Sequence, residues 1–66
     1  MSTDEMREFC ERIHPYGLKV QVRLKSRADL IVGKIVRVDT ERFEMKTDDE
    51  GDECLNYAWV ANITNA

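Results

Sequence analysis

The stretch Gly33-Lys34-Ile35-Val36-Arg37-Val38-Asp39-Thr40-Glu41-Arg42-Phe43 decides the fold of this chain. Its alternating apolar residues predict a half-buried β-strand, and Gly33 lies inside that strand. A glycine in a strand interior marks a sharp bend or a close approach of backbones. Asp39 opens a tight turn, and the next strand follows at once. Because a bent strand allows a short sheet to curl on itself, the sequence predicts a small closed or nearly closed β-barrel.

Strand patterns on both sides of this stretch complete a five-stranded sheet. Apolar residues alternate with mostly basic ones from Leu18 to Lys25, and Phe43 and Met45 are expected to point inward. The acidic segment 48–52 predicts a hairpin loop. The expected strands span about 18–25, 30–38, 42–47, 53–57 and 60–64. Their short connections predict an antiparallel meander.

An amphipathic helix is expected before the sheet, over about residues 3–13. Ser2 and Glu5 have the spacing of an N-terminal capping box. The helix should end before Pro15, because the residue preceding a proline disfavours helical geometry. Its apolar residues share one face, which must pack on the sheet: Met6, Phe9, Cys10 and Ile13.

Length and composition predict a single domain, residues 1–66. A core this small is marginal alone and usually gains stability from disulfides, a metal or a partner subunit. The apolar content of 42% is sufficient for a core and too high for disorder. No apolar run reaches the roughly 20 residues that span a bilayer, and the acidic, helical N-terminus does not resemble a signal peptide. We therefore expect a soluble cytoplasmic protein with no membrane contact.

The charges are segregated along the chain, although the net charge is only −3. Residues 18–46 contain eight basic and four acidic residues, whereas residues 47–66 contain five acidic residues and no basic one. Such asymmetry is consistent with a face for polyanions. The alternative is an ordinary solvated surface of mixed charge.

The helix followed by five bent strands resembles the Sm-like family, which includes the eukaryotic Sm and LSm proteins and bacterial Hfq. The family's first motif is matched by Gly33, by Ile35 two residues later and by Asp39 six residues after the glycine. Only the apolar skeleton of the second motif is present: Leu55, Tyr57, Val60 and Ile63. The resemblance implies an SH3-like (Sm-like) barrel that assembles into a homo-oligomeric ring of five to seven subunits. It also implies single-stranded RNA binding without catalysis.

The residues by which the family grips RNA are mostly replaced here. Glu41 occupies the position of a base-stacking aromatic residue, Phe43 that of a base-recognising asparagine, and Ala58-Trp59 follows Tyr57 where basic residues are usual. Arg42 and Trp59 are the candidates to substitute for them. In the alternative interpretation Trp59 packs at a corner of the barrel and Arg42 pairs with Glu41 or Glu44. The other candidate RNA contacts are Tyr57, Lys19, Arg23, Lys25, Lys34 and Arg37.

An unclosed barrel would leave two sheet edges, which favours ring assembly by pairing of edges between neighbours. Asn56, Tyr57 and Val60 are the candidate interface residues. The rival hypothesis is a protein-interaction or scaffolding module that keeps the barrel and the ring but has lost the RNA contacts.

Other chemistries find little support in the sequence. Cys10 and His14 have a metal-ligand spacing, but a site requires about two further ligands. Cys10 and Cys54 are expected to be buried, reduced thiols rather than a disulfide. The acidic loop fails the calcium-loop pattern, and no nucleophile stands beside His14 in sequence. We expect no metal, no cofactor, no small-molecule substrate and no enzymatic activity.

Overall fold

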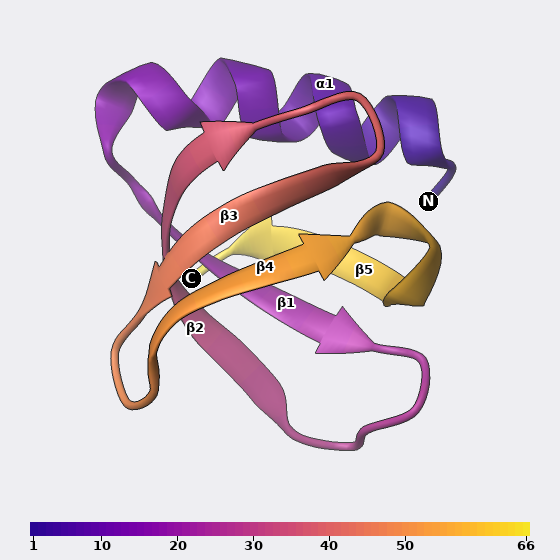
Figure 1. The fold of residues 1–66 in the computed structure, drawn as a ribbon, viewed down its shortest axis with the longest axis vertical. Helices are drawn as coiled ribbons and strands as arrows, with labels where there is room; N and C mark the ends of the chain where they lie inside the picture. The colour runs from indigo at the N-terminus through magenta and orange to yellow at the C-terminus, as the bar shows by residue number, and fades with distance from the viewer.

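The computed structural model describes residues 1–66 and contains one helix followed by a five-stranded antiparallel sheet (Figure 1). The prediction of a mainly β fold with an N-terminal helix is therefore confirmed. Two short 3-10 helices, η1 and η2, precede the first and the last strand. The elements are α1 (Thr3–Ile13), η1 (His14–Tyr16), β1 (Lys19–Leu24), β2 (Leu30–Val38), β3 (Arg42–Thr47), β4 (Gly51–Asn56), η2 (Tyr57–Trp59) and β5 (Val60–Asn65).

Helix α1 begins with the predicted capping box and lies across one side of the sheet (Figure 1). The Ser2 amide donates to the Glu5 carboxylate (3.1 Å), and the Glu5 amide donates to the Ser2 hydroxyl (3.2 Å). Arg7 pairs with Asp4 and also donates to the Thr40 carbonyl (2.9 Å), which ties the helix to the β2–β3 turn. α1 packs on β2 and η2, and its buried side chains are Met6, Cys10 and Ile13.

The sheet has the strand order β4-β3-β2-β1-β5 and does not close into a barrel. Strands β1 to β4 form the predicted meander, but the prediction that β5 continues it is wrong. After β4 the chain turns through η2, and β5 then pairs with β1, with Val22 opposite Ile63. The Lys25 amide donates to the Trp59 carbonyl (2.9 Å) at this crossing. As a result, β4 and β5 are the two free edges of the sheet.

Gly33 lies where the backbone of β2 closely approaches that of β3. A Cβ atom at this position would lie 2.2 Å from the Lys46 carbonyl oxygen and 2.8 Å from the Thr47 Cα. These are backbone atoms, which cannot move aside as the end of a flexible side chain can. The structure thus gives the predicted need for glycine a steric cause, namely close approach of backbones in a curled sheet.

One hydrophobic core fills the space between the helix and the sheet, with Phe43 and Met45 pointing inward as predicted. The bounds of β2 and β3 agree with the prediction, whereas those of β1, β4 and β5 differ by one or two residues. β4 begins at Gly51, inside the segment that was expected to form the hairpin loop. Leu18 precedes β1 and is half-exposed, so the first strand begins one residue later than its pattern indicated. Tyr57 belongs to η2, because β4 ends at Asn56. No helix in the structure combines the length and the apolar character needed to cross a membrane.

Candidate interaction surfaces

The motif residue Asp39 holds the turn between β2 and β3. Its amide donates to the Arg42 carbonyl (2.8 Å), and its own carbonyl accepts a hydrogen bond from the Tyr57 hydroxyl (3.4 Å). The Tyr57 ring packs at 5.3 Å from the ring of Phe43. Asp39 therefore connects the turn to the core, and Phe43 is a packing residue that is not available for base recognition.

Arg37 and Arg42 lie at the end of the β2–β3 pair where the turn joins the two strands, and they line a shallow surface hollow with Asp39, Thr40 and Glu41. Arg37 pairs with Asp39 (3.3 Å) and stands opposite Glu44 in the sheet register. Arg42 is exposed and forms no ion pair, so the alternative in which it pairs with Glu41 or Glu44 is not found. Arg42 is thus a free cation, but it follows Glu41 directly in the chain and lies two residues before Glu44.

The two aromatic candidates for base stacking have opposite environments. Tyr57 is 1% exposed, so it cannot offer a ring face to a ligand. Burial raises the pKa of its hydroxyl, which keeps the phenol protonated. Trp59 is 57% exposed, and the alternative in which it packs at a corner is wrong. Of this pair, the structure leaves only Trp59 accessible.

The remaining predicted basic residues divide into two groups. Arg23 and Lys25 lie near the end of β1, where Arg23 lines a hollow with Leu30 and Asn62. Lys19 and Lys34 are direct cross-strand neighbours on β1 and β2. Lys34 is in turn opposite Lys46 on β3, a residue that the sequence interpretation did not select. The strand pattern alone could not reveal this neighbour, because it does not fix the register of β2 against β3.

The candidate interface residues lie at the β4 edge and the start of β5. Asn56 is the last residue of β4, and its side chain accepts a hydrogen bond from the Ala58 amide (2.9 Å). The Tyr57 amide donates back to the Glu41 carbonyl (3.1 Å). The side chains of Tyr57 and Val60 are both buried in the subunit's own core. Of the three, Asn56 alone has a partly exposed side chain.

The backbone of β4 turns alternate residues toward its free edge. In an antiparallel pair the N–H and C=O of one residue point the same way, and successive residues alternate. The Tyr57 amide donates to the Glu41 carbonyl, so the backbone groups of Tyr57 point toward the β3 side. Counting back by alternation, the backbone groups of Asn56, Cys54 and Asp52 point toward the free edge. On the other edge the Ala66 amide donates to the Lys19 carbonyl (3.2 Å), so Asn65 and Ile63 turn outward from β5. Both edges therefore present backbone groups that no strand pairs, although the Asn65 carbonyl accepts a hydrogen bond from the Gln21 side-chain amide (3.3 Å).

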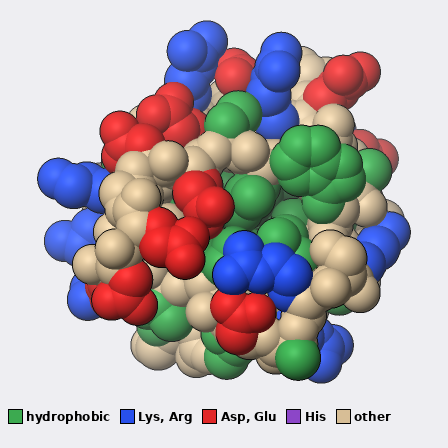
Figure 2. Space-filling model, turned by 60° about the horizontal axis from the view of Figure 1, so that its bottom comes forward, with side chains coloured by type: hydrophobic (Ala, Val, Ile, Leu, Met, Phe, Trp, Pro, Cys, Tyr) green, Lys and Arg blue, Asp and Glu red, His purple; other side chains and the backbone are tan.

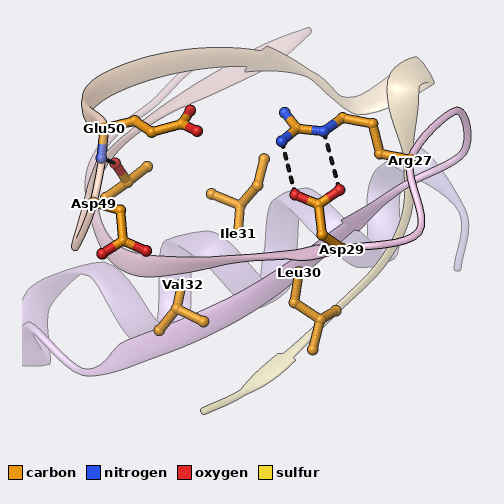
Figure 3. Close-up of a pocket in the computed structure, with 8 residues that line it drawn as sticks. Arg27, Asp29, Leu30, Ile31, Val32, Asp49 and Glu50 are labelled. Carbon is orange, nitrogen blue, oxygen red and sulfur yellow. Dashed lines mark hydrogen bonds and ion pairs between the residues drawn. The ribbon is translucent and has the colours of Figure 1, made fainter.

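A small hollow opens between the β1–β2 connection and the β3–β4 hairpin (Figure 3). Arg27 and Asp29 pair across 2.8 Å on one side, Glu50 faces them from the other, and Ile31 points into the space between. Figure 2 shows exposed apolar atoms bordered by acidic and basic side chains on the face that it views. The hollow measures about 70 Å³, well below the roughly 300–1,000 Å³ of ligand pockets. It is a salt-bridged gap in the surface rather than a ligand site.

The two cysteines are free thiols in different environments. Cys10 is fully buried under the helix, and burial raises the pKa of its thiol to about 12, so it is unreactive at neutral pH. Cys54 is exposed on β4, and the prediction that both thiols are buried is therefore wrong for this one. Residues 52, 54 and 56 point away from the core, so the position of Cys54 in β4 outweighs the tendency of free cysteines to be buried. No three His, Cys, Asp or Glu side chains are grouped so that they could hold a metal ion.

Comparison with known proteins adds no family assignment: no family model matches the chain, and no curated protein matches it.

Proposed function

We propose that this protein is a subunit of an Sm-like homo-oligomeric ring of five to seven copies that binds single-stranded RNA without catalysis. The observation that carries the proposal is the pair of free edges, β4 and β5, on one small open sheet. A head-to-tail contact between unlike edges repeats from copy to copy, and it closes into a ring if the rotation allows. The ring size and the RNA ligand are what the family resemblance implies.

The edges support head-to-tail pairing because they are compatible in geometry. β4 turns the backbone groups of Asn56, Cys54 and Asp52 outward, and β5 turns those of Asn65 and Ile63 outward. Strand addition satisfies such groups by main-chain hydrogen bonds. Assembly would also extend a core of 13 buried residues, which is small for a stable domain.

The charges on the edges disfavour pairing of two identical β4 edges. β4 carries Asp52 and Glu53 and follows the acidic hairpin, whereas β5 carries no charged side chain. Two β4 edges side by side would bring these acids together, and like charges on adjacent strands are destabilising. The neutral β5 edge of a second copy has no such conflict.

The proposed RNA contacts are Arg42, next to the β2–β3 turn, and Trp59, in η2, because both side chains are exposed. Arg42 stands opposite Asn56 in the register, and Asn56 caps the helix η2 that carries Trp59. A free guanidinium binds phosphate, and an exposed indole offers a face on which a base can stack, at about 1–3 kcal/mol per base. Glu41 beside Arg42 weakens the attraction for phosphate, so we expect modest affinity that falls steeply with salt.

A titration of the purified protein with uridine-rich and adenine-rich oligoribonucleotides at several salt concentrations tests the RNA function. Arg42→Ala and Trp59→Ala should each weaken binding. Tyr16→Ala is the matched control for the tryptophan, because Tyr16 is an exposed aromatic residue (74%) outside the proposed site. Binding that neither substitution alters would place the RNA on another surface.

The second candidate function is a protein-interaction or scaffolding ring without RNA contacts. It is favoured by the replacement of the stacking aromatic by Glu41 and by the acidic β4 region. An intact ring that binds neither oligonucleotide at low salt would establish this alternative over the first.

A further inference from the structure

Three lysines lie in one line across the outer face of the sheet. The register pairs Lys19 of β1 with Lys34 of β2, and Lys34 with Lys46 of β3. All three are exposed. Adjacent strands are about 4.8 Å apart, so the line spans roughly 10 Å from the first lysine to the third. We refer to Lys19, Lys34 and Lys46 as the lysine row.

This arrangement is unfavourable for the isolated subunit. Like charges directly opposite each other on neighbouring strands are destabilising, and Lys34 has one on each side. Only Lys19 has an ion-pair partner, Asp48 at 2.9 Å, whereas Lys34 and Lys46 form none. The next cross-strand position after Lys46 is occupied by an acidic residue, Asp52 of β4. Two carboxylates thus flank three ammonium groups, and the central one is left uncompensated.

The lysine row borders an open hollow of about 410 Å³, whose other lining residues are Val36, Thr47 and Asp48. Val36 is 43% exposed and follows Lys34 by two residues, so both side chains point to the same side of β2. The hollow therefore combines positive charges with one apolar surface. A phosphate chain whose sugars or bases contact an apolar side chain fits this combination.

We propose that the lysine row binds the phosphate groups of a single-stranded RNA that runs across β1, β2 and β3. Lysine binds phosphate as a point charge, and a bound strand would relieve the repulsion that the register imposes on Lys34. The proposal rests on RNA being the ligand of the proposed function, but it adds a site. The row lies at the opposite end of the β2–β3 pair from Arg42, which adjoins the turn.

The experiment measures the affinity for uridine-rich and adenine-rich oligoribonucleotides against salt concentration, with Lys34→Gln and Lys46→Gln as test variants. Arg12→Gln removes one exposed positive charge from the helix and is the matched control. Each lysine variant should bind both sequences roughly fivefold to tenfold more weakly, with a salt slope that is smaller by about 0.7. The loss should be equal for the two sequences, because phosphate contacts do not read bases.

A second pair of variants tests the opposite change. Asp52→Asn removes a carboxylate at the end of the lysine row and should tighten binding, whereas Asp49→Asn, at the hairpin tip, should have less effect. Lys34→Gln should not lower the melting temperature, since it removes the charge repulsion between Lys34 and its two cross-strand neighbours, Lys19 and Lys46. This second readout separates loss of binding from loss of folding.

The outcomes distinguish the two proposals. If the parent protein binds RNA and both lysine variants bind equally well, the lysine row is not the site, while the proposed function remains. If the parent binds no RNA at low salt, both proposals fail. Inorganic polyphosphate serves as a third probe: if it binds through the lysine row when RNA does not, the assignment of the row to RNA is overturned.

Discussion

The two free edges of the sheet differ in how they are protected against pairing with another strand. β4 carries Asp52 and Glu53, whereas β5 has no charge from Val60 to Asn65. Charged side chains on an edge strand are a common defence against unwanted pairing. The acids of β4 disfavour pairing of two β4 edges, whereas the uncharged β5 edge has no such protection. The two edges together therefore favour pairing of β4 with β5. This difference gives the proposed assembly its direction.

Glu53 strengthens the contrast between the edges. It stands opposite Met45, and its side-chain atom Oε2 is buried without a hydrogen-bond partner. A buried unsatisfied carboxylate oxygen is costly and uncommon. On an edge strand, a charge turned toward the core is another recognised means of blocking indiscriminate pairing. β5 has no equivalent residue.

The largest effect should come from disrupting the sheet that holds both edges in place. Gly33→Val would place a Cβ atom 2.2 Å from the Lys46 carbonyl oxygen. We expect a loss of about 3 kcal/mol or more in the free energy of unfolding, because the backbones of β2 and β3 must separate. Thermal unfolding followed by circular dichroism measures it.

Gly17→Ala is the matched control for this prediction. A Cβ atom added at Gly17 would have no other atom within 4 Å, so only the positive φ of 61° opposes a side chain there. That strain costs about 1–2 kcal/mol. Equal melting temperatures for Gly33→Val and the parent would refute the close approach of β2 and β3.

The next prediction concerns a substitution that alters the β4 edge alone. Asn56→Pro removes the N–H that faces the free edge, and the Asn56 φ of −77° already suits proline. Losing this donor should weaken each contact by about 1–2 kcal/mol, or roughly tenfold in the association constant. Asn56→Ala is the control, since it loses the cap on η2 but keeps the N–H. Sedimentation velocity that finds the same species for both variants would count against edge pairing.

A smaller effect is expected when the charge of the β5 edge is changed. Thr64 is exposed on the neutral β5 edge, where a neighbour's acidic β4 would lie. Thr64→Asp should weaken assembly severalfold and Thr64→Lys should strengthen it, because exposed charge pairs contribute about 0.2–1 kcal/mol. Both effects should disappear at high salt. Identical responses to the two substitutions would mean that β4 and β5 do not meet.

The smallest effect concerns the thiols. Cys54 is exposed on the β4 edge, and Cys10 is buried with a pKa raised to about 12. In the native protein a thiol reagent should therefore label only Cys54, and Cys10 only after unfolding. A neighbouring β5 strand should slow the labelling of Cys54, and Asn56→Pro should restore the faster rate. Rates that do not change with protein concentration would contradict coverage of this edge.

Local patterns in the sequence predict the helix, its cap and the strands. The order of the strands in the sheet is harder to predict, because it depends on pairing between segments far apart in the sequence. The periodic burial of Met6, Cys10 and Ile13 follows from helix geometry, and Gly33 is recognisable as an unusual strand residue. The pairing of β5 with β1 escapes prediction, because short connections favour neighbours in sequence and η2 resembles a simple corner.

The candidate surface is harder to predict than the fold. The expected burial of Cys54 rests on the hydrophobic character of a free thiol, whereas its neighbour Leu55 points inward and turns Cys54 outward. Lys46 escapes notice because its closeness to Lys34 depends on the register of β2 and β3. Side-chain type is visible in the sequence, but cross-strand position is not.

The most direct test of the account is the mass of the protein in solution. Light scattering at micromolar concentration and moderate salt, recorded after removal of nucleic acid, compares the particle with the 7.7 kDa subunit. We predict a single species of five to seven subunit masses, as expected if every β4 edge pairs with the β5 edge of a neighbour. A particle of one subunit mass under these conditions would contradict it.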